Sequence, residues 1–245
     1  MKSKTLTFLY SIAMLLLWGC HKEPFDAASG TFIDSRDNHE YKWVKIGEQI
    51  WMAENLAYLP EIHKFDNRSD TETRYYVTEY YGTDLIAAKE TENYKTYGVL
   101  YNWPAACEVC PSGWHLPSDD EWKEMERTIG IDEKFLDLWM DDRRGAGFAS
   151  KLKSTKGWYG ISYGEMYGNG TDDFGFTALA GGYASGVLVP PGEDGYWWTS
   201  TNEFHENTNT TEEYPWARNL NYYFTYVDRR FFDKKFGFSV RCIKN

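Results

Sequence analysis

The stretch CPSGWHLPSDDEW, residues 110–122, places a cysteine, a Leu-Pro step and the start of a helix close together in the chain. Ser118 and Glu121 have the Ser-x-x-Glu spacing of a capping box, and they follow Pro117, which ends an extended segment. Hydrophobic residues then recur at helical spacing until Gly130 stops the pattern. The stretch therefore predicts the main helix of the fold, preceded by an extended segment that carries a cysteine.

The segments on either side of this helix have different periodicities. Residues 31–56 alternate between hydrophobic and polar side chains around two sets of turn residues, which predicts three short strands joined by two hairpin turns. Residues 60–96 have no sustained period and are expected to form a long loop or a variable insertion. A short helical turn is expected within 97–109, further helices within 132–140 and 146–154, and short strands within 176–183, 195–201, 217–224, 229–233 and 237–245. This order of strands, helices and strands predicts an α+β fold whose first and last strands pair.

The first residues have the features of a bacterial lipoprotein signal. Lys2 and Lys4 precede an apolar run that is shorter than the roughly 20 residues of a membrane-spanning helix, and Leu17-Trp18-Gly19-Cys20 follows. We expect Cys20 to become the lipidated N-terminus, which would anchor the protein to the outer membrane or cell surface of a Gram-negative bacterium. An ordinary secretory signal peptide is the alternative, and it also predicts export. We expect a signal peptide, a tether and a single domain over residues 1–19, 20–30 and 31–245.

The charge and the aromatic content restrict the classes of partner. The net charge is −11 at pH 7, and loss of the two signal lysines would make it −13. A chain with this much negative charge is not expected to bind the phosphates of nucleic acid. Aromatic residues make up 18% of the chain, which favours exposed rings of the kind that stack on sugars or on partner proteins.

Three cysteines remain after Cys20, namely Cys107, Cys110 and Cys242. Export makes a disulfide the expected state of such cysteines. The Cys-x-x-Cys pair also suggests a redox motif or half of a zinc knuckle, but the chain has neither a thioredoxin-like βαβ pattern nor a second ligand pair at matching spacing. A Cys107–Cys110 bridge would close a tiny loop, whereas a Cys110–Cys242 bridge would close a loop of roughly 130 residues and constrain the unfolded chain more.

The sequence resembles the Fibrobacter succinogenes major paralogous domain family, which is common in surface and periplasmic lipoproteins. The resemblance lies in six blocks that occur in the family's order: YKWVKIGEQIWMAENL, YGVLYNW, CPSGWHLPSDDEW, FGFTALAGGY, GYWWTST and GFSVRCIKN. That family is similar, more distantly, to C-type lectin-like proteins. The resemblance therefore implies a C-type lectin-like domain over about residues 31–245, with short strands at both ends, two to three central helices and long loops.

The resemblance also favours one of the two bridges. Cys110 and Cys242 lie inside family blocks and Cys107 lies just outside them, which implies a Cys110–Cys242 bridge with Cys107 free. Such a bridge would tie the start of the main helix to the last strand. Trp114 and Leu116 are expected to pack beneath it.

The run GWHLPSDDEW is also similar to part of the formylglycine-generating enzymes, which share the lectin-like fold. Those enzymes hold copper with two cysteines near the C-terminus, whereas here Cys242 stands alone there and the expected bridge engages it. His115 is expected to be half-buried and bonded to backbone, and Asp119, Asp120 and Glu121 are the acids that a helix dipole favours in a first turn. We therefore predict a protein that is not an enzyme and holds no metal or cofactor. A formylglycine-generating type of enzyme is the weaker alternative.

Candidate ligand residues lie in the glycine-rich segment after the helices. Trp158 and Tyr159, with Tyr163, would form a stacking platform or else fill the core beneath a loop. Asp172 and Asp173 would either supply oxygen atoms to a ligand or be solvated turn acids. The same two alternatives apply to the pair Glu193-Asp194. The motifs of calcium-dependent lectins, such as Glu-Pro-Asn and Trp-Asn-Asp, do not occur. We expect a binding module for a glycan or an envelope protein, with a purely structural envelope lipoprotein as the alternative.

Overall fold

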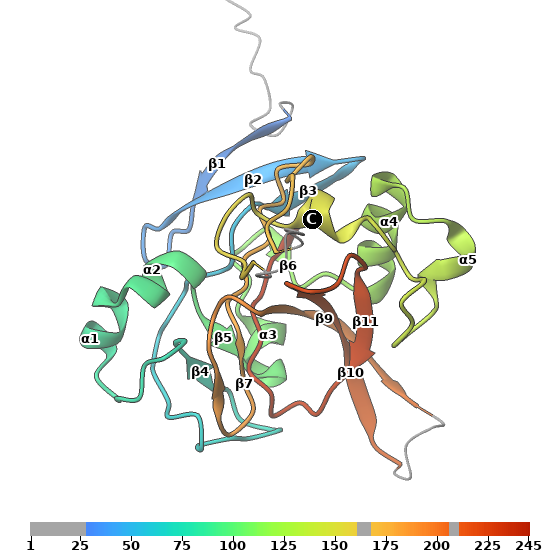
Figure 1. The fold of residues 1–245 in the computed structure, drawn as a ribbon. Coiled ribbons are helices and arrows are strands. Elements are labelled where there is room, and N and C mark those ends of the chain that lie inside the picture. The colour runs from blue at the N-terminus through green and yellow to red at the C-terminus, as the bar shows by residue number, and fades with distance from the viewer. Residues whose placement is uncertain (1–27, 161–167, 206–210) are drawn as a thin grey trace, which may run out of the picture.

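The computed structural model describes residues 28–160, 168–205 and 211–245. These residues form short helices and antiparallel sheets, of which the largest have five and three strands (Figure 1). The predicted α+β class is confirmed at this level. No helix in these ranges is long and apolar enough to cross a membrane. The predicted signal peptide, Cys20, most of the tether and Tyr163 lie outside the described residues.

The five-stranded sheet combines segments that are far apart in the sequence. Its order is β1-β2-β3-β12-β6, and neighbouring strands are antiparallel. The three predicted N-terminal strands are confirmed, and Gly47 adopts the φ of +62° that favours glycine in the tight turn between β2 and β3. The expected pairing of the first and last strands is wrong. The hairpins keep β1, β2 and β3 consecutive, so β12 pairs with β3 and β6 instead. The bounds are Ser29–Ile33 (β1), Glu40–Ile46 (β2), Gln49–Met52 (β3), Trp114–His115 (β6) and Ile243–Lys244 (β12).

The longest described helix, α4 (Asp119–Ile129), is the one that the capping motif predicts. The Glu121 N–H donates to Ser118 Oγ, the Ser118 N–H donates to the Glu121 carboxylate at 2.7 Å, and Gly130 ends the helix with a φ of +111°. The expected helical turn before the cysteine stretch is present as α3, and the two expected later helices are present but shorter, as α5 and α6. The bounds of these three are Trp103–Glu108 (α3), Glu133–Leu136 (α5) and Ala149–Leu152 (α6).

The prediction of a loop over residues 60–96 is wrong. This segment contains β4 (Tyr75–Tyr76), α1 (Leu85–Glu90) and α2 (Glu92–Tyr97), and β4 pairs with β5 (Leu100–Tyr101). Side-chain oxygens of Asp84 and Thr91 cap the two helices. Only Ala88 is buried among the residues of these helices, so they have no hydrophobic period for the sequence to reveal.

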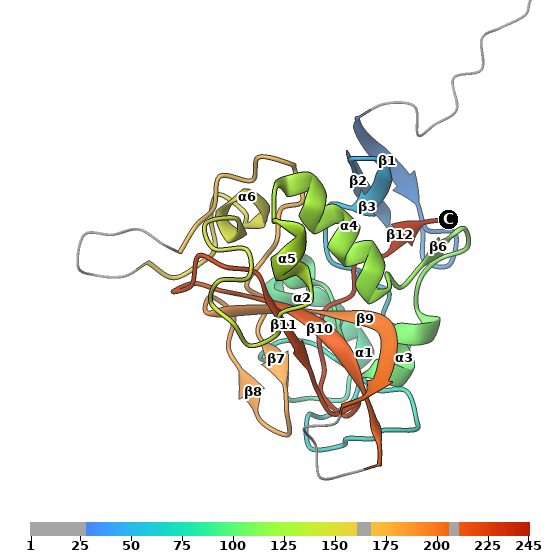
Figure 2. The same ribbon diagram turned by 90° about the vertical axis from the view of Figure 1, so that its right-hand side faces the viewer.

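The three-stranded sheet, in the order β11-β10-β9, lies between helices and a small hairpin. Figure 2 shows α4 and α5 on one side of this sheet and β7 and β8 on the other. Successive residues of a strand point to opposite faces. Accordingly Trp197 joins the hydrophobic cluster that contains Trp122 of α4, while Trp198 joins a second cluster around Phe238 and Cys242. The bounds are Tyr183–Ala184 (β7), Leu188–Val189 (β8), Asp194–Phe204 (β9), Glu213–Asn221 (β10) and Asp228–Phe231 (β11).

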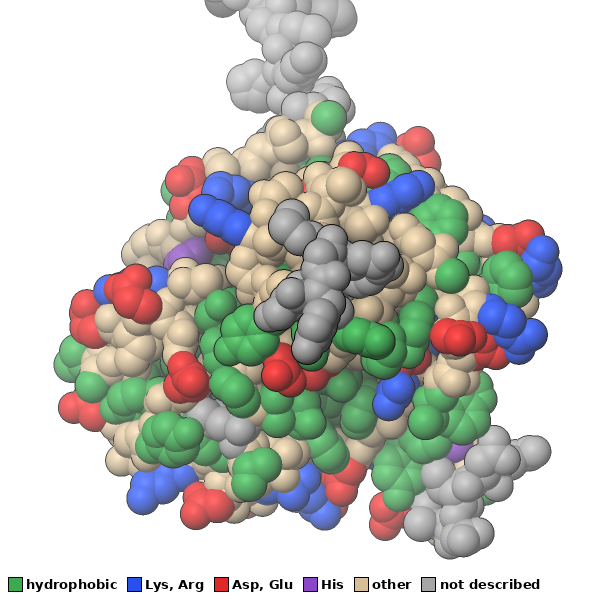
Figure 3. All heavy atoms as spheres, in the orientation of Figure 1, with side chains coloured by type: hydrophobic (Ala, Val, Ile, Leu, Met, Phe, Trp, Pro, Cys, Tyr) green, Lys and Arg blue, Asp and Glu red, His purple; other side chains and the backbone are tan. Residues whose placement is uncertain are grey.

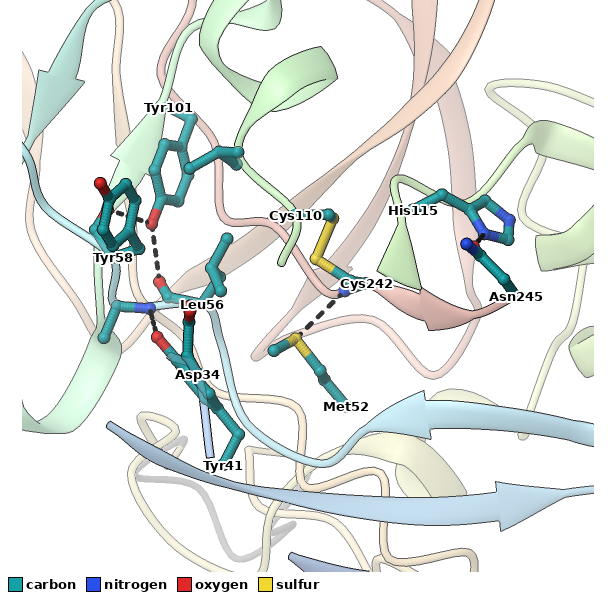
Figure 4. Close-up of a disulfide and its surroundings, with 12 residues drawn as sticks. Asp34, Tyr41, Met52, Leu56, Tyr58, Tyr101, Cys110, His115, Cys242 and Asn245 are labelled. Carbon is teal, nitrogen blue, oxygen red and sulfur yellow. Dashed lines mark hydrogen bonds between the residues drawn. A yellow bond between two sulfur atoms is a disulfide. The ribbon is translucent and has the colours of Figure 1, made fainter. Parts of the chain in front are cut away.

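A disulfide joins Cys110 to Cys242, as the resemblance implied (Figure 4). The Cα atoms are 5.9 Å apart, within the usual range, and the bridge spans 132 residues of sequence. Trp114 and Leu116 are buried in the same cluster as Cys242, in agreement with the expectation that they pack beneath the bridge. Cys107 is free and exposed.

A buried network of charged side chains connects α4 to the three-stranded sheet. Arg218 donates to Asp119 and to Glu126, in each case at 2.7 Å, and Arg229 donates to Asp119 at 2.8 Å. Arg144 donates to the other oxygen of Glu126. Burial alone would raise the pKa of both carboxyl groups, but the arginines outweigh it and hold each pKa below its usual value. The first-turn acid Asp119 is therefore part of a structural network rather than a solvated cap.

Candidate functional site

Five aromatic side chains form a connected ridge on the surface, which we call the aromatic ridge. Four of them come from the turn between β10 and β11, and the fifth precedes one of the gaps in the described chain. Ring centroids of neighbouring members lie between 4.8 and 6.3 Å apart. Tyr159, Tyr223 and Phe224 are 50, 57 and 37% exposed, whereas the other two members are half-buried. The ridge comprises Tyr159, Tyr222, Tyr223, Phe224 and Tyr226.

The rings gather on one surface because β10 ends at Asn221. The Asn221 side-chain oxygen accepts a hydrogen bond from the Tyr223 N–H at 2.8 Å, which is how asparagine closes a tight turn. Had the strand continued, as the sequence predicted through Phe224, successive rings would alternate between the two faces of the sheet. The turn instead presents consecutive rings to solvent.

Lys153 holds this turn from beneath. Its ammonium group donates to the carbonyl of Asn221 at 2.6 Å and to that of Phe224 at 3.0 Å, and it lies 5.1 Å from the centre of the Trp158 ring. The residue is 1% exposed, and burial lowers the pKa of Lys153 to about 8. A buried amine is costly unless its hydrogen bonds are satisfied, and here backbone carbonyls on both sides of the turn satisfy it. The position of the ridge therefore depends on Lys153.

Tyr159 reaches the ridge through the segment that precedes β9. The Tyr159 N–H donates to the carbonyl of Gly192 at 2.8 Å, and the Tyr222 N–H donates to that of Glu193 at 2.7 Å. Gly192 has a φ of +112°, and a Cβ there would lie 2.4 Å from the Tyr159 ring, so only glycine permits this approach. Asp194 completes the junction, because its carboxylate accepts from the Asn221 side chain at 2.8 Å.

Beside the ridge lies an open hollow of about 370 Å³, lined by Asp142 and residues 223–226. Figure 3 shows that hydrophobic side chains, tyrosine included, gather in a broad band on one face of the molecule, with acidic side chains among them. Exposed rings next to carboxylates suit a ligand that has both apolar ring faces and hydroxyl groups.

The predicted ligand residues are not all part of this surface. Trp158 is 4% exposed and its Nε1 donates to the Ala178 carbonyl at 3.0 Å, so its ring fills the core, which is the alternative that the sequence left open. Asp172 accepts hydrogen bonds from the N–H and the hydroxyl of Thr177, each at 2.7 Å, in the manner of a turn acid. Asp173 is exposed and lines a separate hollow beside β1 and β2. Of the four, only Tyr159 belongs to the ridge.

The histidine of the cysteine-containing stretch is held by side chains rather than by backbone, which corrects the expectation for it. His115 Nε2 lies 2.8 Å from a Glu121 oxygen, and Nδ1 lies 2.6 Å from the Asn245 side chain (Figure 4 shows the second contact). The interaction links the first turn of α4 to the end of the last strand. His115 therefore has a structural role in this arrangement.

Comparison with known proteins identifies the family. The sequence matches the Fibrobacter succinogenes major domain over residues 44–244, which is more than half of the chain. The chain belongs to this family. Neither the search of curated proteins nor the search of solved structures found a match. The region matched to the Fibrobacter succinogenes major domain includes both bridged cysteines, Lys153 and every residue of the aromatic ridge.

Sequence reasoning missed the four ridge residues in the β10–β11 turn of this Fibrobacter succinogenes major domain. The signal was present in NYYFTY, residues 221–226, where four aromatic side chains follow an asparagine without the period of a strand. Of the weak oxygen candidates, Asp194 accepts from the Asn221 side chain through its carboxylate, whereas Glu193 accepts from Tyr222 through its backbone carbonyl. No sequence pattern connects either residue with this turn.

Proposed function

We propose that this protein is a non-catalytic lipoprotein of the cell envelope that binds a glycan through the aromatic ridge. The single observation that carries the proposal is the set of five connected rings, three of them clearly exposed, fixed from beneath by Lys153. A soluble protein rarely leaves such a group of large rings in water unless the rings bind something. The adjacent carboxylates and amides supply hydrogen-bond partners for hydroxyl groups.

The non-catalytic part of the proposal has support from the residues that first suggested chemistry. The negative charge of Asp119 is balanced by arginines within the buried charged network. His115 is held between Glu121 and Asn245. The disulfide engages Cys242, so a copper site of the formylglycine-generating type lacks its cysteine pair. Each of these groups thus has a structural partner.

The C-type lectin-like architecture is also part of the proposal, as a single domain over residues 31–245. Two features support it: the disulfide between the segment before α4 and the last strand, and a sheet that joins the first strands to the last. Binding residues in proteins are disproportionately found on loops that a rigid scaffold positions. Four residues of the aromatic ridge lie on the connection between β10 and β11.

Replacing Tyr223 with alanine is expected to weaken glycan binding about tenfold or more, the equivalent of about 1.4 kcal/mol, because exposed aromatic rings are the usual binding hot spots. A glycan array followed by calorimetry measures the change. Tyr81→Ala is the matched control, since this ring is 68% exposed but lines a different hollow, with Phe65. Equal losses in the two variants would contradict the assignment.

The alternatives correspond to other results of the same experiment. If the wild-type protein binds no glycan but captures an envelope protein in a Tyr223-dependent way, the ridge is a protein-binding surface. If it binds nothing across glycan panels and envelope extracts, a structural lipoprotein is the better description.

Anchoring through Cys20 is proposed from the Leu17-Trp18-Gly19-Cys20 sequence after an apolar run. Metabolic labelling with a radioactive fatty acid in a Gram-negative host is expected to label the wild-type protein and not Cys20→Ser. The Cys107→Ser variant controls for loss of a free thiol and should label normally, because its exposed cysteine is not at the signal. Label that persists in Cys20→Ser would exclude acylation at this residue.

A further inference from the structure

We infer that the aromatic ridge takes a single uncharged glycan chain, rather than an acidic polysaccharide or the flat face of a crystalline one. This inference rests on the proposed function, because it specifies the ligand class of the same surface. It follows from two properties of the ridge: the orientations of its rings and the charges around it.

The ring planes exclude a flat ligand. Tyr159 is inclined by 74° to Tyr222, Tyr222 by 66° to Tyr223, and Tyr223 by 80° to Phe224. Among the four neighbouring pairs, Phe224 and Tyr226 alone are close to parallel, at 25°, and these two stack on each other at 4.8 Å. A crystalline sugar surface needs coplanar rings to stack on, because each sugar lies with its face against a ring. Steeply inclined rings instead suit an isolated chain whose successive sugars turn.

The acidic side chains next to the ridge exclude a polyanion. Asp142 lines the hollow together with residues 223–226. Asp194 adjoins the base of the ridge, because its carboxylate accepts a hydrogen bond from the Asn221 side chain. Like charges brought together at a binding surface oppose association, so uronate or phosphate groups of a ligand would be repelled here.

Three cations near the turn and its acids have partners of their own. Arg143 is paired with Asp141 at 2.6 Å, and Arg230 is paired with the buried Asp228. The ammonium of Lys153 points into the turn and is occupied by backbone carbonyls. The described surface of the ridge therefore offers hydrogen-bond acceptors in the form of carboxylates. Such acceptors suit the hydroxyl groups of a neutral sugar, which donate hydrogen bonds.

Calorimetry with the full mature chain tests the inference directly. The probes are neutral hexasaccharides of glucose, mannose, xylose and galactose, together with hexagalacturonate, and a pull-down on microcrystalline cellulose adds the flat surface. We expect binding to at least one neutral hexasaccharide, with an affinity that changes little between about 50 and about 500 mM salt because the ligand is uncharged. We expect Tyr223→Ala to weaken that binding about tenfold or more. Hexagalacturonate and cellulose should not bind.

A charge reversal makes the test independent of the neutral ligand's identity. Asp142→Lys is an exposed substitution, and it is expected to let hexagalacturonate bind measurably at about 50 mM salt, with loss of that binding at about 500 mM. Asp120→Lys, an equally exposed change on α4, should not do so. Tyr223-dependent binding of hexagalacturonate or cellulose by the wild-type protein would overturn the inference but leave glycan binding intact. Failure to bind any glycan would instead remove the proposed function itself.

Discussion

Replacing Glu126 with glutamine is expected to lower the free energy of unfolding by about 3–5 kcal/mol, which is the usual cost of removing one partner from a buried ion pair. Glu126 is fully buried and bonded to both Arg144 and Arg218. Glutamine keeps the shape but removes the charge, so two buried guanidinium groups lose a counter-ion. Chemical denaturation of the two proteins at neutral pH measures the difference.

The matched control lies on the same helix. Glu124 is exposed and pairs with Arg127 at 2.8 Å, so Glu124→Gln should cost at most about 1 kcal/mol. The pKa of Glu126 is held below its usual value, so its contribution is present above about pH 4.5 and is lost as the pH falls through the lower folded pKa. The wild-type protein should therefore lose more stability in acid than Glu126→Gln does. Similar denaturation curves for Glu124→Gln and Glu126→Gln would show that the network does not stabilise the fold.

Removal of the disulfide is expected to have an effect of similar size. Cys242→Ser opens a bridge that spans 132 residues, and the chain-entropy account assigns about 4–5 kcal/mol to a loop of that length. The melting temperature should fall by roughly 10 °C, because each kcal/mol is equivalent to a few degrees in a domain of this size. Differential scanning calorimetry measures the shift.

Cys107→Ser is the control for that experiment. This cysteine is exposed and free, so its replacement should leave the melting temperature nearly unchanged. Mass spectrometry of a non-reduced digest should recover the peptides of Cys110 and Cys242 as one linked species. A linked Cys107–Cys110 peptide together with a free Cys242 would contradict the assigned bridge.

The parts of the fold that could be predicted are those in which local sequence signals agree with the final contacts. The capping box at Ser118 defined the start of α4, and hairpin turns defined the first three strands. The two short helices α1 and α2 were not predicted, because each is capped but almost none of their residues are buried. The position of β12 in the sheet was not predicted either, since strand order depends on contacts between residues nearly two hundred positions apart, such as Ile243 with Trp51.

The candidate site was predictable only in part. Tyr159 was among the expected ligand residues, but Trp158 next to it turned inward to support Lys153. Adjacent aromatic residues in an irregular segment carry no period, so sequence alone does not distinguish the exposed ring from the buried one. Tyr222, Tyr223 and Phe224 were assigned to a strand, but a single hydrogen bond from the Tyr223 N–H to the Asn221 side-chain oxygen ends that strand earlier. Such a bond decides which rings reach solvent, but it cannot be recognised from the amino-acid composition of the segment.

The distance between the bridged cysteines also affects the order of events during biosynthesis. Under the proposed export, Cys110 precedes Cys242 by 132 residues into the oxidising cell envelope, which leaves an interval before Cys242 arrives. Throughout that interval Cys107 is the nearest thiol to Cys110 in the chain. An early oxidant would therefore join these neighbours first, and the native bridge would then form by thiol–disulfide exchange once Cys242 arrives. Production of the native protein should consequently benefit from a disulfide isomerase, and the Cys107→Ser variant should not need one.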